Sequence, residues 1–153
     1  MNGRKPENQM QVKFPSRSVN ESLARSLVAA FAALADPTVD ELCDIKTAVS
    51  EAVTNAIVHG YREAMGLVYI TAALYPGGRL VITIRDRGCG IADIKKAREP
   101  IFTTCQNGER AGLGFAVMEE LMDKVQVRSR LGQGTTVVME RTLSAREQGP
   151  LGL

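Results

Sequence analysis

Residues 50–61 read SEAVTNAIVHGY and decide the predicted fold, because they form the second half of a long amphipathic helix. Thr38 and Glu41 have the spacing of a capping box, and Pro37 before them cannot continue an earlier helix. Apolar residues then recur at steps of three and four, at Leu42, Ile45, Val49, Ala52, Val53 and Ala56. The spacing predicts a helix that begins at Thr38, ends near Gly60 and packs this stripe against a core.

Three polar residues share one face of that helix beside the apolar stripe. Glu51, Asn55 and His59 stand four residues apart, and such residues lie one above another on a helix. An acid and an amide at the margin of an apolar face lose solvation, which costs free energy. Such residues therefore indicate a functional site if a ligand or partner there binds them. A solvated rim with an i,i+4 hydrogen bond also fits this helix taken alone. His59 we take as structural.

The composition indicates one soluble domain in a reducing compartment. The chain has 153 residues, and its 19 basic and 17 acidic residues give a net charge of +2. Balanced charge without a basic run, together with few aromatic residues, argues against direct DNA binding. The three cysteines are an odd number without a C-x-x-C pair, which argues against disulfides and a zinc site. The longest apolar run, 27–35, is too short for a membrane span and residues 1–8 carry no secretion signal, so we expect a cytoplasmic protein.

The chain before Pro37 predicts a strand followed by a helix. Met10, Val12 and Phe14 alternate with polar residues up to Pro15, as in a short strand. Ser18 and Glu21 repeat the capping-box spacing and predict a helix over 19–35. Its expected apolar face comprises Leu23, Leu27, Ala30, Phe31 and Leu34, with Asn20, Glu21 and Arg25 on the other, solvated side.

Residues 68–86 predict an antiparallel hairpin that ends in an inward-facing acid. Apolar residues alternate over 68–74 and 80–84, on either side of a turn at 76–78. Asp86 has the same parity as Ile82 and Ile84, so its carboxylate is expected on the buried face. A carboxylate in that place is costly unless a hydrogen-bonding partner meets it.

Glycines follow Asp86 and recur before the last predicted helix. Gly88 and Gly90 let the backbone approach a ligand closely, although a tight turn also explains them. Residues 92–111 lack periodicity, apart from a possible short helix over 93–98, as in a lid or binding loop. The glycines of the run 112–114 then lead into an amphipathic run over 115–122. A glycine-rich helix entry suits an anion, and a flexible hinge fits it nearly as well.

A last hairpin completes the predicted fold. Val125 and Val127 begin one strand, a turn follows at 132–134, and Thr135 faces inward at the start of the returning strand. The element order predicts an α+β fold, a two-layer α/β sandwich with a mainly antiparallel mixed sheet and helices on one face. We expect one domain over 9–142, with flexible segments at 1–8 and 143–153.

Four polar features fall on the helix-facing side of this sheet: Glu51 with Asn55, Asp86 with its glycines, the 112–114 helix entry, and Thr135 after Gly134. Together they indicate a phosphate-bearing ligand. They also resemble the N, G1, G2 and GT boxes of the GHKL ATP-binding superfamily, in the pattern Glu51-xxx-Asn55, Asp86-x-Gly88-x-Gly90, Gly112-x-Gly114 and Gly134-Thr135. The likeness extends over 10–142 and implies a Bergerat-type ATP pocket between helices and sheet, closed by the lid 92–111.

The resemblance implies a role for each of these residues. Asn55 offers an oxygen to Mg²⁺, Glu51 accepts the proton of an attacking hydroxyl, and Asp86 takes the adenine amino hydrogen. Arg110 is the candidate for the γ-phosphate. The remaining expected nucleotide contacts are Gly88, Gly90, Thr103, Thr104, Gly112, Leu113, Gly114 and Thr135.

The runs DELCDIKTAVSEAVTNAIVHGY, PIFTT and ERAGLGF resemble more specifically the anti-sigma-F family of spore-forming bacteria. That resemblance implies a homodimeric protein-serine/threonine kinase that binds ATP or ADP with Mg²⁺. Its implied partners are a sporulation sigma factor of the sigma-F type, which it inhibits, and an anti-anti-sigma factor, which it phosphorylates on serine. The family places partner contacts on the first helix, which selects Glu21 and Arg25.

Two alternatives remain open from the sequence. A related anti-sigma kinase for a stress or general sigma factor would share every pocket residue. A nucleotide-gated binding module without kinase activity would share the pocket as well. A histidine kinase fragment or a gyrase-like ATPase fits less well, because phospho-acceptor helices and a transducer domain are not found in the sequence.

Overall fold

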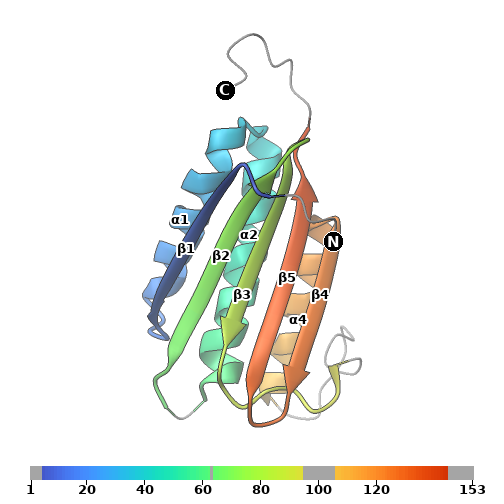
Figure 1. Cartoon of the computed structure of the whole chain (residues 1–153). Coiled ribbons are helices and arrows are strands. Elements are labelled where there is room, and N and C mark those ends of the chain that lie inside the picture. Colours follow the sequence, from blue (N-terminus) through green and yellow to red (C-terminus); the bar gives the residue numbers. More distant parts are fainter. Residues whose placement is uncertain (1–4, 63, 95–105, 145–153) are drawn as a thin grey trace.

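A five-stranded sheet forms one layer of the molecule and helices form the other (Figure 1). The computed structural model describes residues 5–62, 64–94 and 106–144, and of residues 106–112 the backbone alone. The strands are β1 (Asn8–Pro15), β2 (Leu67–Tyr75), β3 (Arg79–Asp86), β4 (Lys124–Arg130) and β5 (Gly134–Thr142). The helical elements are α1 (Asn20–Ala32), η1 (Ala33–Ala35), α2 (Val39–Thr54), η2 (Asn55–Gly60) and α4 (Gln106–Leu121).

The sheet order is β1-β2-β3-β5-β4, and each neighbouring pair runs antiparallel. The predicted α+β sandwich is therefore confirmed, and so are both hairpins with their glycine-containing turns. The predicted mixed character of the sheet is not found, because every neighbouring pair of the described strands is antiparallel. Within the described residues, no helix is long and apolar enough to cross a bilayer.

The core lies between the inward faces of the strands and the helix layer. Side chains of one parity on β2 and β3 are buried, including Val68, Ile70, Leu80, Ile82 and Ile84. The stripe predicted for α2 is buried at Ile45, Val49, Ala52, Val53 and Ala56, while Leu42 is half-buried. The helix that carries the polar residues is therefore fixed against the centre of the sheet.

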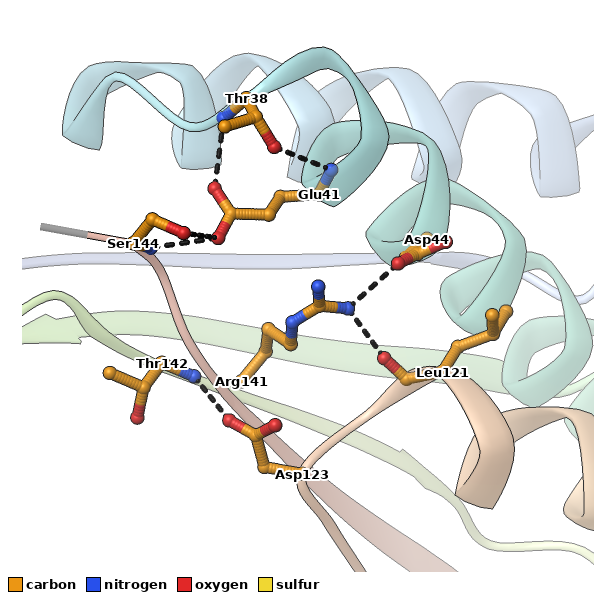
Figure 2. A network of polar contacts seen from close by, with 8 residues as sticks. All are labelled: Thr38, Glu41, Asp44, Leu121, Asp123, Arg141, Thr142 and Ser144. Carbon is orange, nitrogen blue, oxygen red and sulfur yellow. Dashed lines mark hydrogen bonds and ion pairs between the residues drawn. The ribbon is translucent and has the colours of Figure 1, made fainter. Parts of the chain in front are cut away.

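The predicted capping box at the start of α2 is confirmed. Glu41 N–H donates to Thr38 Oγ1 at 3.0 Å, and Thr38 N–H donates to Glu41 Oε1 at 2.8 Å. The other oxygen of Glu41 accepts from the N–H and the hydroxyl of Ser144, both at 2.7 Å (Figure 2). These contacts extend two residues beyond β5, whose last residue is Thr142, and they tie the end of the sheet to the start of α2.

Arg141 forms a second tie at the same end of the molecule. Its guanidinium donates to Asp44 Oδ2 at 2.9 Å and to the Leu121 carbonyl at 2.6 Å (Figure 2). One side chain of β5 thus holds the first half of α2 and the last residue of α4. A charged hydrogen bond to a helix C-terminal carbonyl also satisfies a group that the helix itself leaves open.

The second capping box, at Ser18 and Glu21, was a wrong prediction. The residue before α1 is Val19, its backbone is already helical (φ −64°, ψ −24°), and no side chain caps this end. Ser18 contributes its carbonyl instead, which accepts from Glu21 N–H at 3.2 Å. The helix begins from a backbone turn, and the Glu21 carboxylate turns to Arg25.

The apolar face predicted for α1 was also partly wrong. The residues buried on this helix are Ala24, Val28, Phe31 and Ala32. Of the predicted set, Leu23, Ala30 and Leu34 are exposed and Leu27 is half-buried. Two apolar stripes run along α1 with the same helical period, and the one rich in alanine faces the core.

Candidate functional site

Glu51 and Asn55 lie at the junction of α2 and η2. Glu51 occupies the last turn of α2, and Asn55 begins η2, whose wider turns have the i→i+5 hydrogen bonds of a π-helix, such as Tyr61 N–H to the Ala56 carbonyl at 3.1 Å. The sequence predicted a regular helix to Gly60, so the π turn is a correction. Short π segments are rare and frequently mark functional sites. Asn55 Nδ2 is buried, and no residue in the described parts of the chain hydrogen-bonds to it.

Gly114 of α4 packs against both of these side chains. A Cβ built on Gly114 would lie 3.1 Å from Glu51 Oε1 and 3.2 Å from Asn55 Nδ2. The acid and the amide therefore meet at one place, as their four-residue spacing predicts. Glycine, which has no Cβ, therefore lets the backbone of α4 lie this close to the Glu51 carboxylate and the Asn55 amide without displacing them.

The predicted helix entry at 112–114 was wrong. Helix α4 begins at Gln106, so Gly112 and Gly114 lie in its interior. The N–H groups there are not the free ones of a helix N-terminus, which removes the dipole argument at this position. The physical use of Gly114 in this structure is close approach to α2.

Asp86 ends β3 with its carboxylate on the inner face, as the parity predicts. It is 5 % exposed, and burial raises the pKa of its carboxyl group above the ordinary value, while hydrogen bonds from the backbone of Gly88 and Thr135 offset part of that effect. The Gly88 N–H donates to Asp86 Oδ1 at 2.9 Å. The carboxyl group is therefore held in place by backbone groups inside the protein.

Glycines allow the end of η2 to press on this carboxylate. A Cβ on Gly60 would lie 2.8 Å from Asp86 Cγ, and a Cβ on Gly88 would overlap the Gly60 carbonyl. The Cys89 N–H donates to that same carbonyl at 2.9 Å. Segment η2 thus begins at Asn55, beside Glu51, and ends against Asp86, so it joins the two halves of the site.

The loop after Asp86 is also fastened to the β4–β5 hairpin. Ser129 Oγ accepts from the Ile91 N–H at 2.7 Å and lies 2.8 Å from Thr135 Oγ1. Thr135 is buried and pairs with Asp86 across the sheet, as expected from its parity. Gly90 packs on the Arg130 carbonyl. The predicted residues of β3, its loop and β5 are thereby brought together.

The structure leaves several predicted residues untested. Thr103, Thr104, most of the expected lid and the end of the possible helix over 93–98 lie outside the described residues, and so does the side chain of Arg110. Leu113 is exposed on α4. On α1, the Arg25 guanidinium lies 3.5 Å from Glu21 and 3.3 Å from the Ser50 hydroxyl, next in sequence to Glu51.

Three residues of the site were missed from the sequence. Gly60 abuts Asp86, Ser129 holds the loop, and the Tyr61 hydroxyl accepts from the Arg87 N–H and donates to the Leu67 carbonyl, both at 2.6 Å. Ser129 has the inward parity of Val125 and Val127, which could have selected it. The roles of Gly60 and Tyr61 depend on the path of the chain after η2, for which the sequence carries no local signal.

The fit of a nucleotide to this site can be judged from its two ends. One end offers a buried carboxyl group and a threonine hydroxyl, which suit a base. The other offers an acid, a buried amide nitrogen without a described partner, and space kept open by a glycine. The described residues contain no group of three or more His, Cys, Asp or Glu that could hold a metal ion. Mg²⁺ is ordinarily held by few protein ligands together with phosphate oxygens and waters, so a single ligand such as Asn55 agrees with this donor set.

Comparison with known proteins gives matches over nearly the whole domain. Residues 14–141 match the model of the histidine kinase-like ATPase domain. An anti-sigma F factor of Heyndrickxia coagulans is 52% identical over 141 residues, 92% of this chain and 96% of that protein. An anti-sigma F factor of Thermoanaerobacter sp. (strain X514) is 51% identical over 138 residues, 90% of this chain and 96% of that protein.

Solved structures agree with the fold. The RsbU and RsbW domains of a Mycobacterium tuberculosis protein align with a TM-score of 0.67 at 22% identity, over 90% of this chain and 32% of that chain. A blue-light activated histidine kinase of Erythrobacter litoralis aligns with a TM-score of 0.55 at 26% identity, over 74% of this chain and 34% of that one.

Proposed function

Because this chain belongs to the histidine kinase-like ATPase family and, within it, to the anti-sigma F factors, we propose that it is a nucleotide-dependent anti-sigma kinase. It binds and inhibits a sporulation sigma factor of the sigma-F type. With Mg-ATP it phosphorylates a serine on an anti-anti-sigma factor, its antagonist. The observation that carries the catalytic part is the meeting of Glu51, Asn55 and Gly114 at one end of η2, with Asp86 at the other.

The base end of the site recognises adenine. Asp86, when ionised, is an acceptor without donors, so it takes the amino hydrogen of adenine and rejects the carbonyl that guanine presents there. The backbone of Gly88 and Thr135 keeps the carboxyl group in position, and the Thr135 hydroxyl adds a second polar contact. The glycines around Asp86 keep side chains away from the base.

The phosphate end of the site positions the reacting groups. ATP supplies the phosphoryl group, and Mg²⁺ neutralises charge on its phosphates. Asn55 would hold the metal through its amide oxygen, and Glu51 accepts the proton of the attacking serine hydroxyl. The phosphate contacts of Gly112, Leu113 and Gly114 remain those that the family resemblance implies. Arg110, Thr103 and Thr104 keep the phosphate-contacting roles that the family resemblance implies.

The protein partners approach over α1 and α2. Arg25 is hydrogen-bonded to Ser50, so a protein docked on Glu21 and Arg25 lies beside the turn that carries Glu51. We infer that a serine on such a protein reaches the Glu51 carboxylate. The active species is a homodimer, supported by an exposed apolar stripe on the opposite flank of α1.

The decisive experiment compares binding and phosphoryl transfer in the same variant. Glu51→Ala is expected to keep ATP affinity and to lose about 10²–10⁴-fold in transfer to the anti-anti-sigma protein, because a general base acts on the hydroxyl and not on the bound nucleotide. Radiolabelled ATP and isothermal titration measure the two quantities. Asn55→Ala is expected instead to raise the Mg²⁺ concentration needed for tight ATP binding.

Asp40→Ala provides the matched control, because it removes an exposed acid from the same helix at a distance from the site. Equal loss of ATP binding and transfer in Glu51→Ala would exclude the base role. Absence of label on serine in the wild type would favour a nucleotide-gated binding module. Pull-down against a panel of sigma factors separates sporulation from stress partners.

A further inference from the structure

The outer face of the sheet carries a concentration of basic side chains at one end. Strand pairing places Lys13, Arg85 and Arg128 in one row across the sheet, through Tyr69 and Thr136. Arg87 and Arg130 follow two positions later along the chain, at the same end. All five basic side chains are exposed. We call Lys13, Arg85, Arg87, Arg128 and Arg130 the outer basic patch.

The face that carries this patch is uncovered in the described molecule. Helices α1, α2 and α4 lie behind the sheet, whereas the outer face of all strands is open to the viewer (Figure 1). A solvated outer face is ordinary for an antiparallel sheet, but such a face usually mixes both signs of charge. Here the row through Tyr69 contains no acid.

The charge of the patch is not compensated by described neighbours. On this face the described ion pair is Arg79 with Glu140, at 3.1 Å, and it lies toward the other end of the strands. None of the five patch side chains is found in a salt bridge among the described residues. The helix layer is rich in acids: α2 carries Asp40, Glu41, Asp44 and Glu51 against Lys46, and α4 ends with Glu119 and Glu120. The net charge of +2 therefore conceals a separation of charge between the two faces.

Two of the arginines are held in place on one aromatic ring. The guanidinium carbon of Arg85 lies 4.8 Å from the centroid of Tyr69, and that of Arg87 lies 5.2 Å from it. Cation–π contacts fix two like charges close together on a flat surface. Ordering both guanidinium groups in advance lowers the entropy lost when a partner binds them.

We propose that the outer basic patch docks an acidic segment of another protein in an extended conformation. Arg85 and Arg87, and likewise Arg128 and Arg130, are two residues apart, about 7 Å along a strand. Alternate side chains of an extended segment have the same spacing, so carboxylates at every second position meet successive guanidinium groups. Paired Arg–carboxylate hydrogen bonds are among the strongest that proteins form.

A protein segment fits this surface better than a nucleic acid does. Two guanidinium groups already lie over the Tyr69 ring, so a base that stacked there would compete with them. The surface is a flat sheet face, without a described helix that could enter a groove.

The test measures binding of a fluorescein-labelled peptide of alternating glutamate and threonine by fluorescence anisotropy. We expect binding in low salt that weakens as salt rises to about 200 mM, and none for the matching glutamine–threonine peptide. The double variant Arg128→Glu, Arg130→Glu should bind the acidic peptide at least about tenfold more weakly. Both residues are exposed on the edge strand β4, so the fold, checked by circular dichroism, is expected to survive.

The control is Lys5→Glu, Lys46→Glu, which makes the same change in net charge away from the patch and should alter binding less than about twofold. Three results would overturn the proposal. They are absence of peptide binding in low salt, an equal loss in the control variant, and tighter binding of single-stranded DNA than of the peptide. Amide shifts on addition of the peptide should map to the outward residues Thr83, Thr136 and Val138.

Discussion

At Gly114 the missing side chain sets how closely α4 approaches the acid and the amide of the site. An added methyl would stand 3.1 Å from Glu51 Oε1, tighter than ordinary contact, and would push that carboxylate away. Alanine in a helix interior is otherwise favoured over glycine by about 0.5–1 kcal/mol. We therefore expect Gly114→Ala to keep or raise the melting temperature while phosphoryl transfer falls at least about tenfold.

The reciprocal change Ala116→Gly is the control for this prediction, because it lies in the same helix. It should lower the free energy of unfolding by about 1 kcal/mol and leave transfer unchanged. Calorimetry and a transfer assay on both variants give the comparison. If Gly114→Ala were fully active, contact with Glu51 and Asn55 would not be the reason for glycine at this position.

Glu41 makes the stability of the protein depend on acid pH. Burial by itself would raise the pKa of Glu41, but hydrogen bonds from Thr38 and Ser144 outweigh it and lower the pKa from 4.5 to about 2. The unfolded chain therefore binds the proton more readily, and the stabilisation is present above pH 4.5 and lost as the pH falls toward 2. We expect Glu41→Gln to cost about 2–3 kcal/mol at neutral pH, and less as the pH falls through this window.

Urea denaturation at several pH values measures this difference between the two proteins. Asp40→Asn removes a neighbouring exposed acid in the same helical turn, and it should cost less than about 1 kcal/mol at neutral pH. A gap between wild type and Glu41→Gln that stays constant from neutral to acid pH would show that the ionised carboxylate is not the stabilising group.

Among the elements, α2 was predictable because two independent signals agree along it. The capping box at Thr38 and the apolar stripe through Ile45 and Val49 specify the same start and the same buried face. On α1 the stripes 23/27/30/34 and 24/28/31 have equal periodicity, and the larger leucines favoured the wrong one. Small residues such as Ala24 and Ala32 allow α1 to pack closely on α2 and the sheet. Which of the two stripes is buried therefore depends on tertiary contacts that the sequence of α1 does not reveal.

In the site, too, local sequence signals predicted some features, and tertiary packing decided the others. Parity alone predicted the inward carboxyl group of Asp86 and the inward hydroxyl of Thr135, because side chains alternate strictly along a strand. Helical spacing predicted that Glu51 and Asn55 meet. The π turns of η2 and the start of α4 at Gln106 could not be predicted, since each is decided by what the segment packs against. The outer basic patch was missed because its charges alternate with other residues and form no run.

At the scale of the whole molecule, the exposed apolar stripe of α1 is the surface that most requires a partner. Val19, Leu23 and Leu34 are 66, 47 and 60 % exposed and recur on one flank of the helix, with the half-buried Leu27 between them. A contiguous apolar stripe on a soluble domain marks an interface more often than an isolated exposed leucine does. The stripe lies on the flank away from Glu21 and Arg25, so dimer contacts and partner docking need not compete.

We accordingly expect the purified protein to sediment as a dimer. The variant Leu23→Glu should sediment as a monomer, because the change places a charge in the centre of the stripe and leaves the core untouched. Leu131→Glu is the matched control: Leu131 is 67 % exposed in the β4–β5 turn, and its substitution should leave the dimer intact. Analytical ultracentrifugation over a range of concentrations gives the dissociation constant of each variant, and the loss should be about a hundredfold or more. If Leu23→Glu remained dimeric but no longer bound the sigma factor, the stripe would be the partner-binding surface. The two subunits would then have to contact each other elsewhere, and the edge strand β1 would be the next candidate for the dimer interface.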